Sequence, residues 1–135
     1  MFKVGIIGYS GQKFNTERAS TLIKKAFEQI PSDDEIAIVS GLTAIGIPNM
    51  AYQEADRRGW KTIGIACSKA QDYPCYPCDE VHIVGAEWGD ESSLFLDSID
   101  MLIRVGGGKQ SFAECETAKA MGLAVYGLEL ESEFN

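Results

Sequence analysis

Residues 102–114 read LIRVGGGKQSFAE, an apolar run that meets three glycines and continues into a segment of helical character. A strand that turns into a helix through residues without a Cβ lets a ligand approach the bare backbone N–H groups at the helix N-terminus. The helix dipole favours an anion at that end. The stretch therefore predicts a phosphate, or a group of similar charge, bound at this turn.

Strand and helix signals alternate along the rest of the chain. Apolar runs predict strands at 3–8, 35–39, 62–66, 80–84, 101–105 and 124–128, and helical periodicity predicts helices at 16–30, 48–58 and 111–121, with a short one after residue 90. Asn15 and Asp90 are the expected N-caps of the first helix and of the short one. Parallel strands need crossovers that cover the sheet. The alternation therefore predicts an α/β fold: a single Rossmann-like domain over residues 1–135, with three α/β/α layers and a mainly parallel sheet.

Glycine-containing loops follow the first, second and fifth predicted strands. In open parallel sheets, ligands bind outside the carboxyl ends of the strands, where the strand order reverses. We therefore expect these three loops to open at one edge of the sheet and to bind the ligand together. The candidate ligand-binding residues are Gly8, Tyr9, Ser10, Ser40, Gly41, Thr43, Gly46, Arg104, Gly106, Gly107, Gly108, Lys109, Gln110 and Ser111.

Several of these residues also have a structural explanation. Ser40 and Thr43 can hydrogen-bond a phosphate or a ribose, or they can cap the helix that begins near Pro48. Tyr9 and Ser10 can contact a base or a sugar, and a tyrosine at this position can equally pack on the rim of the site. The sequence leaves both explanations open.

Composition narrows the class of partner. With 135 residues, 45% of them hydrophobic, the chain has enough apolar surface for one core. A net charge of −8 argues against nucleic acid as a partner. No apolar run approaches the roughly 20 residues that span a bilayer, and residues 1–5 begin a strand rather than a signal peptide. We expect a cytoplasmic protein that binds a small phosphorylated molecule and neither nucleic acid nor membrane.

The spacing of Cys75 and Cys78 is that of a CxxC motif. A structural zinc site usually needs a second pair or several histidines, and His82 is the only histidine. A thioredoxin-like motif begins a helix, whereas Pro74 and Pro77 predict an irregular loop. We expect reduced, non-catalytic thiols and no metal, with a metal or redox role as the alternative.

Two regions resemble the signature motifs of the Lonely Guy-like proteins: Ser40-Gly41 followed by residues 46–51, GIPNMA, and residues 100–114, DMLIRVGGGKQSFAE. These proteins were long mislabelled lysine decarboxylases, and the wider superfamily includes nucleotide sensors and molybdenum-cofactor carrier proteins. The similarity covers nearly the whole chain in strand order and spacing. It implies a Rossmann-like homodimer or higher homo-oligomer that binds a nucleoside monophosphate or a related phosphorylated ligand.

The enzymes of this family cleave the N-glycosidic bond of nucleoside 5′-monophosphates, without a cofactor, and release the base and ribose 5-phosphate. Their second motif is Pro-Gly-Gly-x-Gly-Thr-x-x-Glu. Here Gly106 takes the place of the proline, residues 107–108 match, Gln110 replaces a glycine, and Ser111 keeps the hydroxyl of the threonine. The resemblance implies that Glu114, which matches the catalytic glutamate, is the candidate catalytic residue.

One departure from the family pattern changes the local charge. Family enzymes carry an arginine nine residues before the aspartate that begins the fifth strand, and counting back from Asp100 gives Glu91. An anion at this position favours binding without turnover. Lys109 and Arg104 are candidates for the missing positive charge. Arg104 can instead pair with an acidic neighbour such as Glu87.

Three functions follow from these residues. The first is a binding or carrier protein for a nucleotide or a pterin-type phosphorylated ligand. The second is a nucleoside-monophosphate phosphoribohydrolase that uses Glu114, although Ser111 and Glu114 also match the S-x-x-E capping box of a helix start. The third is a sensor whose oligomeric state changes on binding. Trp88 is either a stacking platform or an oligomer contact, and Met121 is expected in the core.

Overall fold

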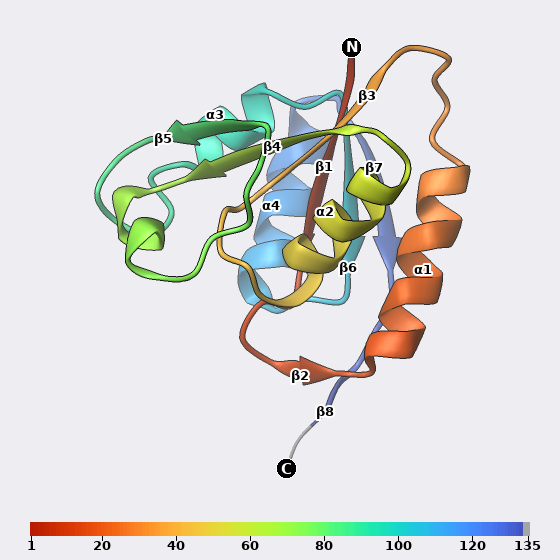
Figure 1. The fold of residues 1–135 in the computed structure, drawn as a ribbon, viewed down its shortest axis with the longest axis horizontal. Helices are drawn as coiled ribbons and strands as arrows, with labels where there is room; N and C mark the ends of the chain where they lie inside the picture. The colour runs from red at the N-terminus through yellow and green to blue at the C-terminus, as the bar shows by residue number, and fades with distance from the viewer. Residues whose placement is uncertain (134–135) are drawn as a thin grey trace.

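Six parallel strands form the central sheet of the computed structural model, which describes residues 1–133 (Figure 1). The strand order is β5-β4-β3-β1-β6-β7, and every neighbouring pair is parallel. The strands are β1 (Phe2–Gly8), β3 (Ile36–Ser40), β4 (Lys61–Ala66), β5 (Glu80–Ile83), β6 (Met101–Val105) and β7 (Ala124–Leu128). The prediction of a parallel α/β sheet is confirmed; residues 134–135, the end of the predicted domain, lie outside the described residues.

Helices cover both faces of this sheet. On one face lie α1 (Thr16–Glu28) and α2 (Gly46–Arg57), and on the other lie α3 (Ser92–Asp97) and α4 (Lys109–Ala120). In Figure 1, α2 lies in front of the sheet and α4 behind it. Each face has its own apolar core because strand side chains alternate between the two sides. The result is the expected three-layer, Rossmann-like arrangement.

The first helix shows how local sequence defines an element. The Asn15 side chain accepts a hydrogen bond from the backbone N–H of Arg18 at 3.0 Å, so Asn15 is the N-cap, as predicted. Ile23 and Phe27, one turn apart, are buried against the sheet. The helix ends before Pro31, which cannot continue it.

The prediction that Asp90 caps the short helix is wrong. That helix, α3, begins at Ser92 and has Glu91 at its N-cap position. The Asp90 carboxylate instead accepts hydrogen bonds from the backbone N–H groups of Ala86 and Glu87, both at 3.0 Å. Asp90 therefore stabilises the turn that precedes the helix.

Three short elements had no signal in the sequence. They are β2 (Lys13–Phe14) and β8 (Ser132–Glu133), which pair antiparallel, and the 3₁₀ helix η1 (Ser68–Asp72). Two-residue strands are too short to show a period. The β2–β8 pair joins the loop after β1 to the last described residues, below the sheet in Figure 1.

The strand order fixes where a ligand site can lie. From β1 the chain proceeds outward through β3, β4 and β5, and it then returns to the other side of β1 to form β6 and β7. The order therefore reverses between β1 and β6, where Gly8 pairs with Val105 at the carboxyl ends. Within residues 1–133, no helix is long and apolar enough to cross a membrane.

Candidate functional site

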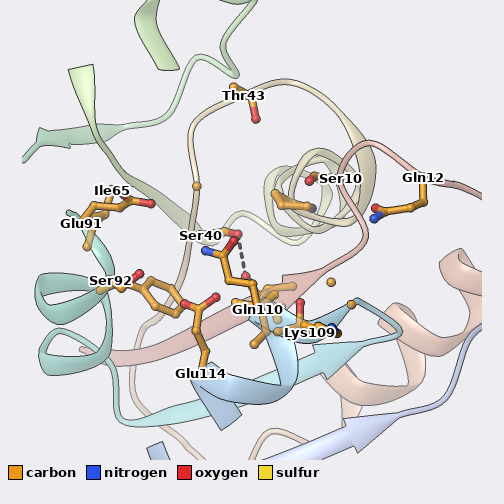
Figure 2. Close-up of a pocket in the computed structure, with 18 residues that line it drawn as sticks. Ser10, Gln12, Ser40, Thr43, Ile65, Glu91, Ser92, Lys109, Gln110 and Glu114 are labelled. Carbon is orange, nitrogen blue, oxygen red and sulfur yellow. Dashed lines mark hydrogen bonds between the residues drawn. The ribbon is translucent and has the colours of Figure 1, made fainter. Parts of the chain in front are cut away.

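A cavity of about 310 Å³ lies at this switch point. The loops after β1, β3 and β6 all reach it, together with the start of α3 (Figure 2). The predicted site residues that line it are Gly8, Ser10, Ser40, Gly41, Thr43, Gly108, Lys109, Gln110, Ser111 and Glu114. The three glycine-containing loops thus open into one space, the arrangement expected from the strand order.

Gly106 and Gly107 shape the turn and do not line the cavity. Their φ angles are +62° and +100°, a region that side chains with a Cβ rarely adopt. A Cβ on Gly106 would lie 2.4 Å from Cε2 of Tyr9, and one on Gly107 would lie 2.5 Å from Oγ of Ser111. These glycines allow the chain to turn sharply from β6 into α4.

The N-terminus of α4 opens toward the cavity. Gly108 is the N-cap, and no side chain caps the first turn, so the N–H groups there are free to bind an anion. Lys109 follows at once, and within the described residues its ammonium forms no ion pair. Lys109 and the N-terminus of α4 therefore place positive charge on the same wall of the cavity.

The capping-box explanation of Ser111 and Glu114 is wrong. Ser111 is the third residue of α4, not its N-cap, and it is buried beneath Gly107. Glu114 lies further along the helix and lines the cavity. Figure 2 shows the side chains of Glu114 and Gln110 rising from α4 toward Ser40.

Glu114 has an unusual electrostatic setting. Partial burial raises its pKa to about 7, and the nearby charge of Glu91 adds to the increase. Within residues 1–133, no lysine or arginine pairs with it. A carboxyl group with a pKa near neutrality can both donate and accept a proton, the property that a general acid or base requires.

Arg104 lies outside the cavity. Its guanidinium donates to the backbone carbonyl of Gly106 at 2.9 Å and to the Glu129 carboxylate at 2.6 Å, and it stacks over the Phe112 ring at 4.1 Å. The alternative that Arg104 pairs with an acidic residue is confirmed, but the partner is Glu129 and not Glu87, which pairs with Lys69. Through its hydrogen bond to Gly106, Arg104 stabilises the glycine turn without reaching the cavity.

Tyr9 and Gly46 lie where the loop after β1 packs against the start of α2. The Tyr9 ring stacks on Phe14 at 6.0 Å, and its carbonyl accepts from the backbone N–H of Ile47 at 2.8 Å. A Cβ on Gly46, whose φ is +65°, would lie 2.3 Å from that carbonyl oxygen. Neither residue lines the cavity, so rim packing is the explanation that the structure supports for Tyr9.

Ser40 and Thr43 do not cap α2. The N-cap position is occupied by Ile45, and no side chain bonds there. The Ser40 hydroxyl donates to the Ile6 carbonyl at 2.6 Å, the contact drawn in Figure 2, although Ser40 still lines the cavity. Thr43 forms a wall of the cavity and is held by a β-bridge to Cys75.

The loop that carries Cys75 and Cys78 supports the wall of the cavity that Thr43 forms. The backbone N–H of Ala44 donates to the Pro74 carbonyl at 2.8 Å, and that of Tyr76 donates to the Leu42 carbonyl at 2.9 Å. All four cysteines are free thiols in the structure. Within residues 1–133, no three His, Cys, Asp or Glu side chains are grouped as a metal site would need.

Sequence reasoning missed other residues that line the cavity: Gln12, Ile65, Ser92 and Phe95. Gln12 lies in the same loop as Ser10, and treating that whole loop as a candidate would have included it. Ser92 and Phe95 come from α3, where no glycine motif marks a site. They reach the cavity because Phe95 packs on the sheet.

The sequence matches a protein-family model over residues 1–135, and this match identifies the family of the chain. The chain belongs to the SLOG cluster4 family. No curated protein matches this SLOG cluster4 chain closely enough to count as a relative. The comparison with solved structures is more informative.

Three solved structures share the fold of this SLOG cluster4 protein. The molybdenum cofactor binding protein from Rippkaea orientalis has a TM-score of 0.77 at 23% identity, over 95% of this chain and 76% of that one. The molybdenum cofactor carrier protein from Chlamydomonas reinhardtii has a TM-score of 0.70 at 20% identity, over 93% and 75%. The structural-genomics target TM1055 has a TM-score of 0.66 at 22% identity, over 93% and 72%. These likenesses show the Rossmann-like fold that the Lonely Guy-like resemblance implied.

Proposed function

We propose that residues 1–135 form a single domain that binds a nucleotide or a pterin-type phosphorylated ligand without turning it over. The observation that carries this proposal is that the α4 N-terminus, which no side chain caps, and Lys109, which pairs with no acidic group among residues 1–133, both line the switch-point cavity. Helix N–H groups and a lysine together form a site for phosphate. On a chain of net charge −8, an anion needs such a local site.

The named neighbours support this choice of ligand class. Two proteins of the same fold are named for binding or carrying the molybdenum cofactor. The shared fold makes a phosphorylated pterin a ligand to test beside the nucleoside monophosphates. We extend the proposal to a homodimer or higher homo-oligomer, as the Lonely Guy-like resemblance implies, located in the cytoplasm, where the four thiols would stay reduced.

Thermal unfolding with a panel of nucleoside phosphates, phosphosugars and phosphorylated pterins tests the proposal. A ligand at 100 times its Kd stabilises the folded state by about 2.7 kcal/mol. Lys109→Ala should weaken binding by about tenfold or more, because a charge-assisted contact is lost. Lys119→Ala, which removes the same charge at the opposite end of α4, is the matched control and should leave the affinity unchanged. Equal losses in the two variants would contradict a specific role for Lys109.

A second function, nucleoside-monophosphate phosphoribohydrolase, is favoured by the pKa of Glu114. A carboxyl group with a pKa of about 7 that faces a ligand cavity can supply the acid or base that glycosidic cleavage needs. Glu91 at the family's arginine position argues against it, since it adds negative charge beside the ligand phosphate. Release of free base from a bound monophosphate, abolished by Glu114→Gln with binding retained, would establish the enzyme. Binding without release would establish the carrier.

The sensor alternative has its own measurement. If ligand binding changes the oligomeric state, the mass in solution should shift when a bound ligand is added. A constant mass with saturating ligand would contradict this alternative and leave the binding proposal unchanged.

A further inference from the structure

A second hollow lies beside the cavity, in the groove between α3 and α4. Its volume is about 630 Å³. Its lining includes the apolar side chains of Trp88, Leu96, Ala113 and Met121. Met121, expected in the core, is instead 45% exposed here, and Trp88 is 55% exposed. We call the hollow lined by these four residues the α3–α4 groove.

The α3–α4 groove adjoins the switch-point cavity, and the two hollows share part of their walls. Ser92, Gln110 and Glu114 line both spaces. Figure 2 shows Ser92 and Glu114 on neighbouring helices at this junction. The two adjoining hollows thus extend from Lys109 and the α4 N-terminus, past Glu114, to Trp88. One end is suited to an anion and the other to an apolar surface.

The tryptophan is held in place before any ligand arrives. It lies in a turn between Gly85 and Gly89, whose φ angles of +77° and +101° allow the backbone to double back. The Asp90 carboxylate fixes this turn through its two hydrogen bonds. The Trp88 ring also lies 6.1 Å from the ring of Tyr73. A pre-positioned indole needs little ordering to stack on a flat ligand.

We propose that the α3–α4 groove is a second subsite, which takes the planar heteroaromatic ring of the ligand whose phosphate is bound at the glycine turn. The inference rests on the proposed function and narrows it: the ligand joins a phosphate to a flat ring through a linker that passes Glu114. A phosphosugar alone would fill only one of the two hollows. A second copy of this chain, with its net charge of −8, fits the groove less well because it would meet the carboxylates of Asp97 and Glu91, whereas the ring end of the ligand carries no charge.

Tryptophan fluorescence and affinity test the subsite together. The probes are ribose 5-phosphate, adenosine and guanosine 5′-monophosphates, and a phosphorylated pterin. We expect the ring-bearing probes to bind about tenfold or more tighter than ribose 5-phosphate, as base stacking on an aromatic side chain predicts. They should also quench the indole emission. Trp88→Ala should remove both effects and leave the affinity for ribose 5-phosphate unchanged.

The second tryptophan provides the matched control. Trp60 packs on Phe27, with ring centroids 5.3 Å apart, on the opposite face of the sheet from the α3–α4 groove. Trp60→Phe should therefore keep both the quenching and the preference for a ring. Because Trp88 is exposed, Trp88→Ala is expected to fold normally.

Each contrary result has a distinct meaning. If ribose 5-phosphate and the ring-bearing probes bind equally, and Trp88→Ala changes neither, the subsite is refuted while the proposed phosphate site stands. If none of the probes binds, the proposed function fails and the subsite fails with it. If Trp88→Ala lowers the oligomeric mass and leaves all affinities unchanged, the groove is an interface between copies, and the proposal is overturned.

Discussion

The ionised form of Glu114 should destabilise the folded protein. Partial burial and the charge of Glu91 raise its pKa from the ordinary 4.5 to about 7. Each pH unit of such a difference is worth about 1.4 kcal/mol, so ionised Glu114 costs the folded state at most about 3.4 kcal/mol. The side chain keeps some contact with solvent, which screens this cost, and we expect about 1–2 kcal/mol.

Proton binding gives the sign of the effect. Well below pH 4.5 the carboxyl is protonated in both the folded and the unfolded chain, and it costs nothing. As the pH rises toward about 7, the unfolded chain releases a proton that the folded chain keeps, so the free energy of unfolding falls. Glu114→Gln removes the charge at nearly constant size. It should stabilise the protein by about 1–2 kcal/mol at about pH 8.5 and change little near pH 4.5.

Urea unfolding followed by circular dichroism at these two pH values measures the difference. Glu116→Gln is the control, because Glu116 is an exposed residue of the same helix and its substitution changes the net charge equally. Equal stabilisation by both variants at high pH would show that net charge, and not burial, is responsible. A gain from Glu114→Gln that is the same at both pH values would refute the reasoning outright.

Two further predictions concern the glycine turn. Gly106→Ala should lower the free energy of unfolding by more than about 1–2 kcal/mol, the cost of its φ of +62° alone, because the new Cβ would also lie 2.4 Å from Cε2 of Tyr9. Gly108→Ala, at a residue with a negative φ and open space for a Cβ, should cost much less, and urea unfolding of both variants measures the difference. Arg104→Met should cost about 1–3 kcal/mol, because the buried carbonyl of Gly106 loses its donor. Because Arg104 does not line the cavity, calorimetric titration at low temperature, where the variant stays folded, should return an affinity for the proposed phosphorylated ligand close to that of the original chain.

The sequence predicts strand positions well because buried parallel strands are continuous apolar runs. The bounds of β6 and β7 agree with the predicted strands 101–105 and 124–128. The meeting of three loops at one edge also follows from topology alone, since carboxyl ends of parallel strands share an edge. These parts depend on the pattern of the chain and not on any one side chain.

Side-chain direction is what the sequence does not predict. Arg104 was a candidate ligand contact, but it points to the α4 side of the sheet and reaches Glu129, a residue beyond β7. That partner depends on the register between β6 and β7, which no local pattern encodes. For the same reason the sequence could not choose between ligand contact and rim packing for Tyr9, and it placed Gly46 in the site: their contacts join segments that are distant in sequence.

Helix α4 shows a second limit. Its buried positions are Ser111, Cys115 and Ala118, which are small or polar and leave little apolar periodicity to read. The predicted helix 111–121 starts two residues too late, and the capping-box pattern puts the N-cap at Ser111, three residues after Gly108. The helix begins at Lys109 because the glycine turn, rather than a capping side chain, redirects the backbone there.

The central position of β1 makes the cavity depend on segments that are far apart in the sequence. On the α4 side, β1 pairs with β6, and the two strands are separated by nearly three-quarters of the sequence. A molecule in which only β1, β3, β4 and β5 have paired still lacks the turn and the helix that form the wall of the proposed phosphate site. The cavity forms only when β6 pairs with β1 and α4 packs on the sheet. A ligand bound there would therefore stabilise only molecules in which this pairing is in place, in proportion to its free concentration.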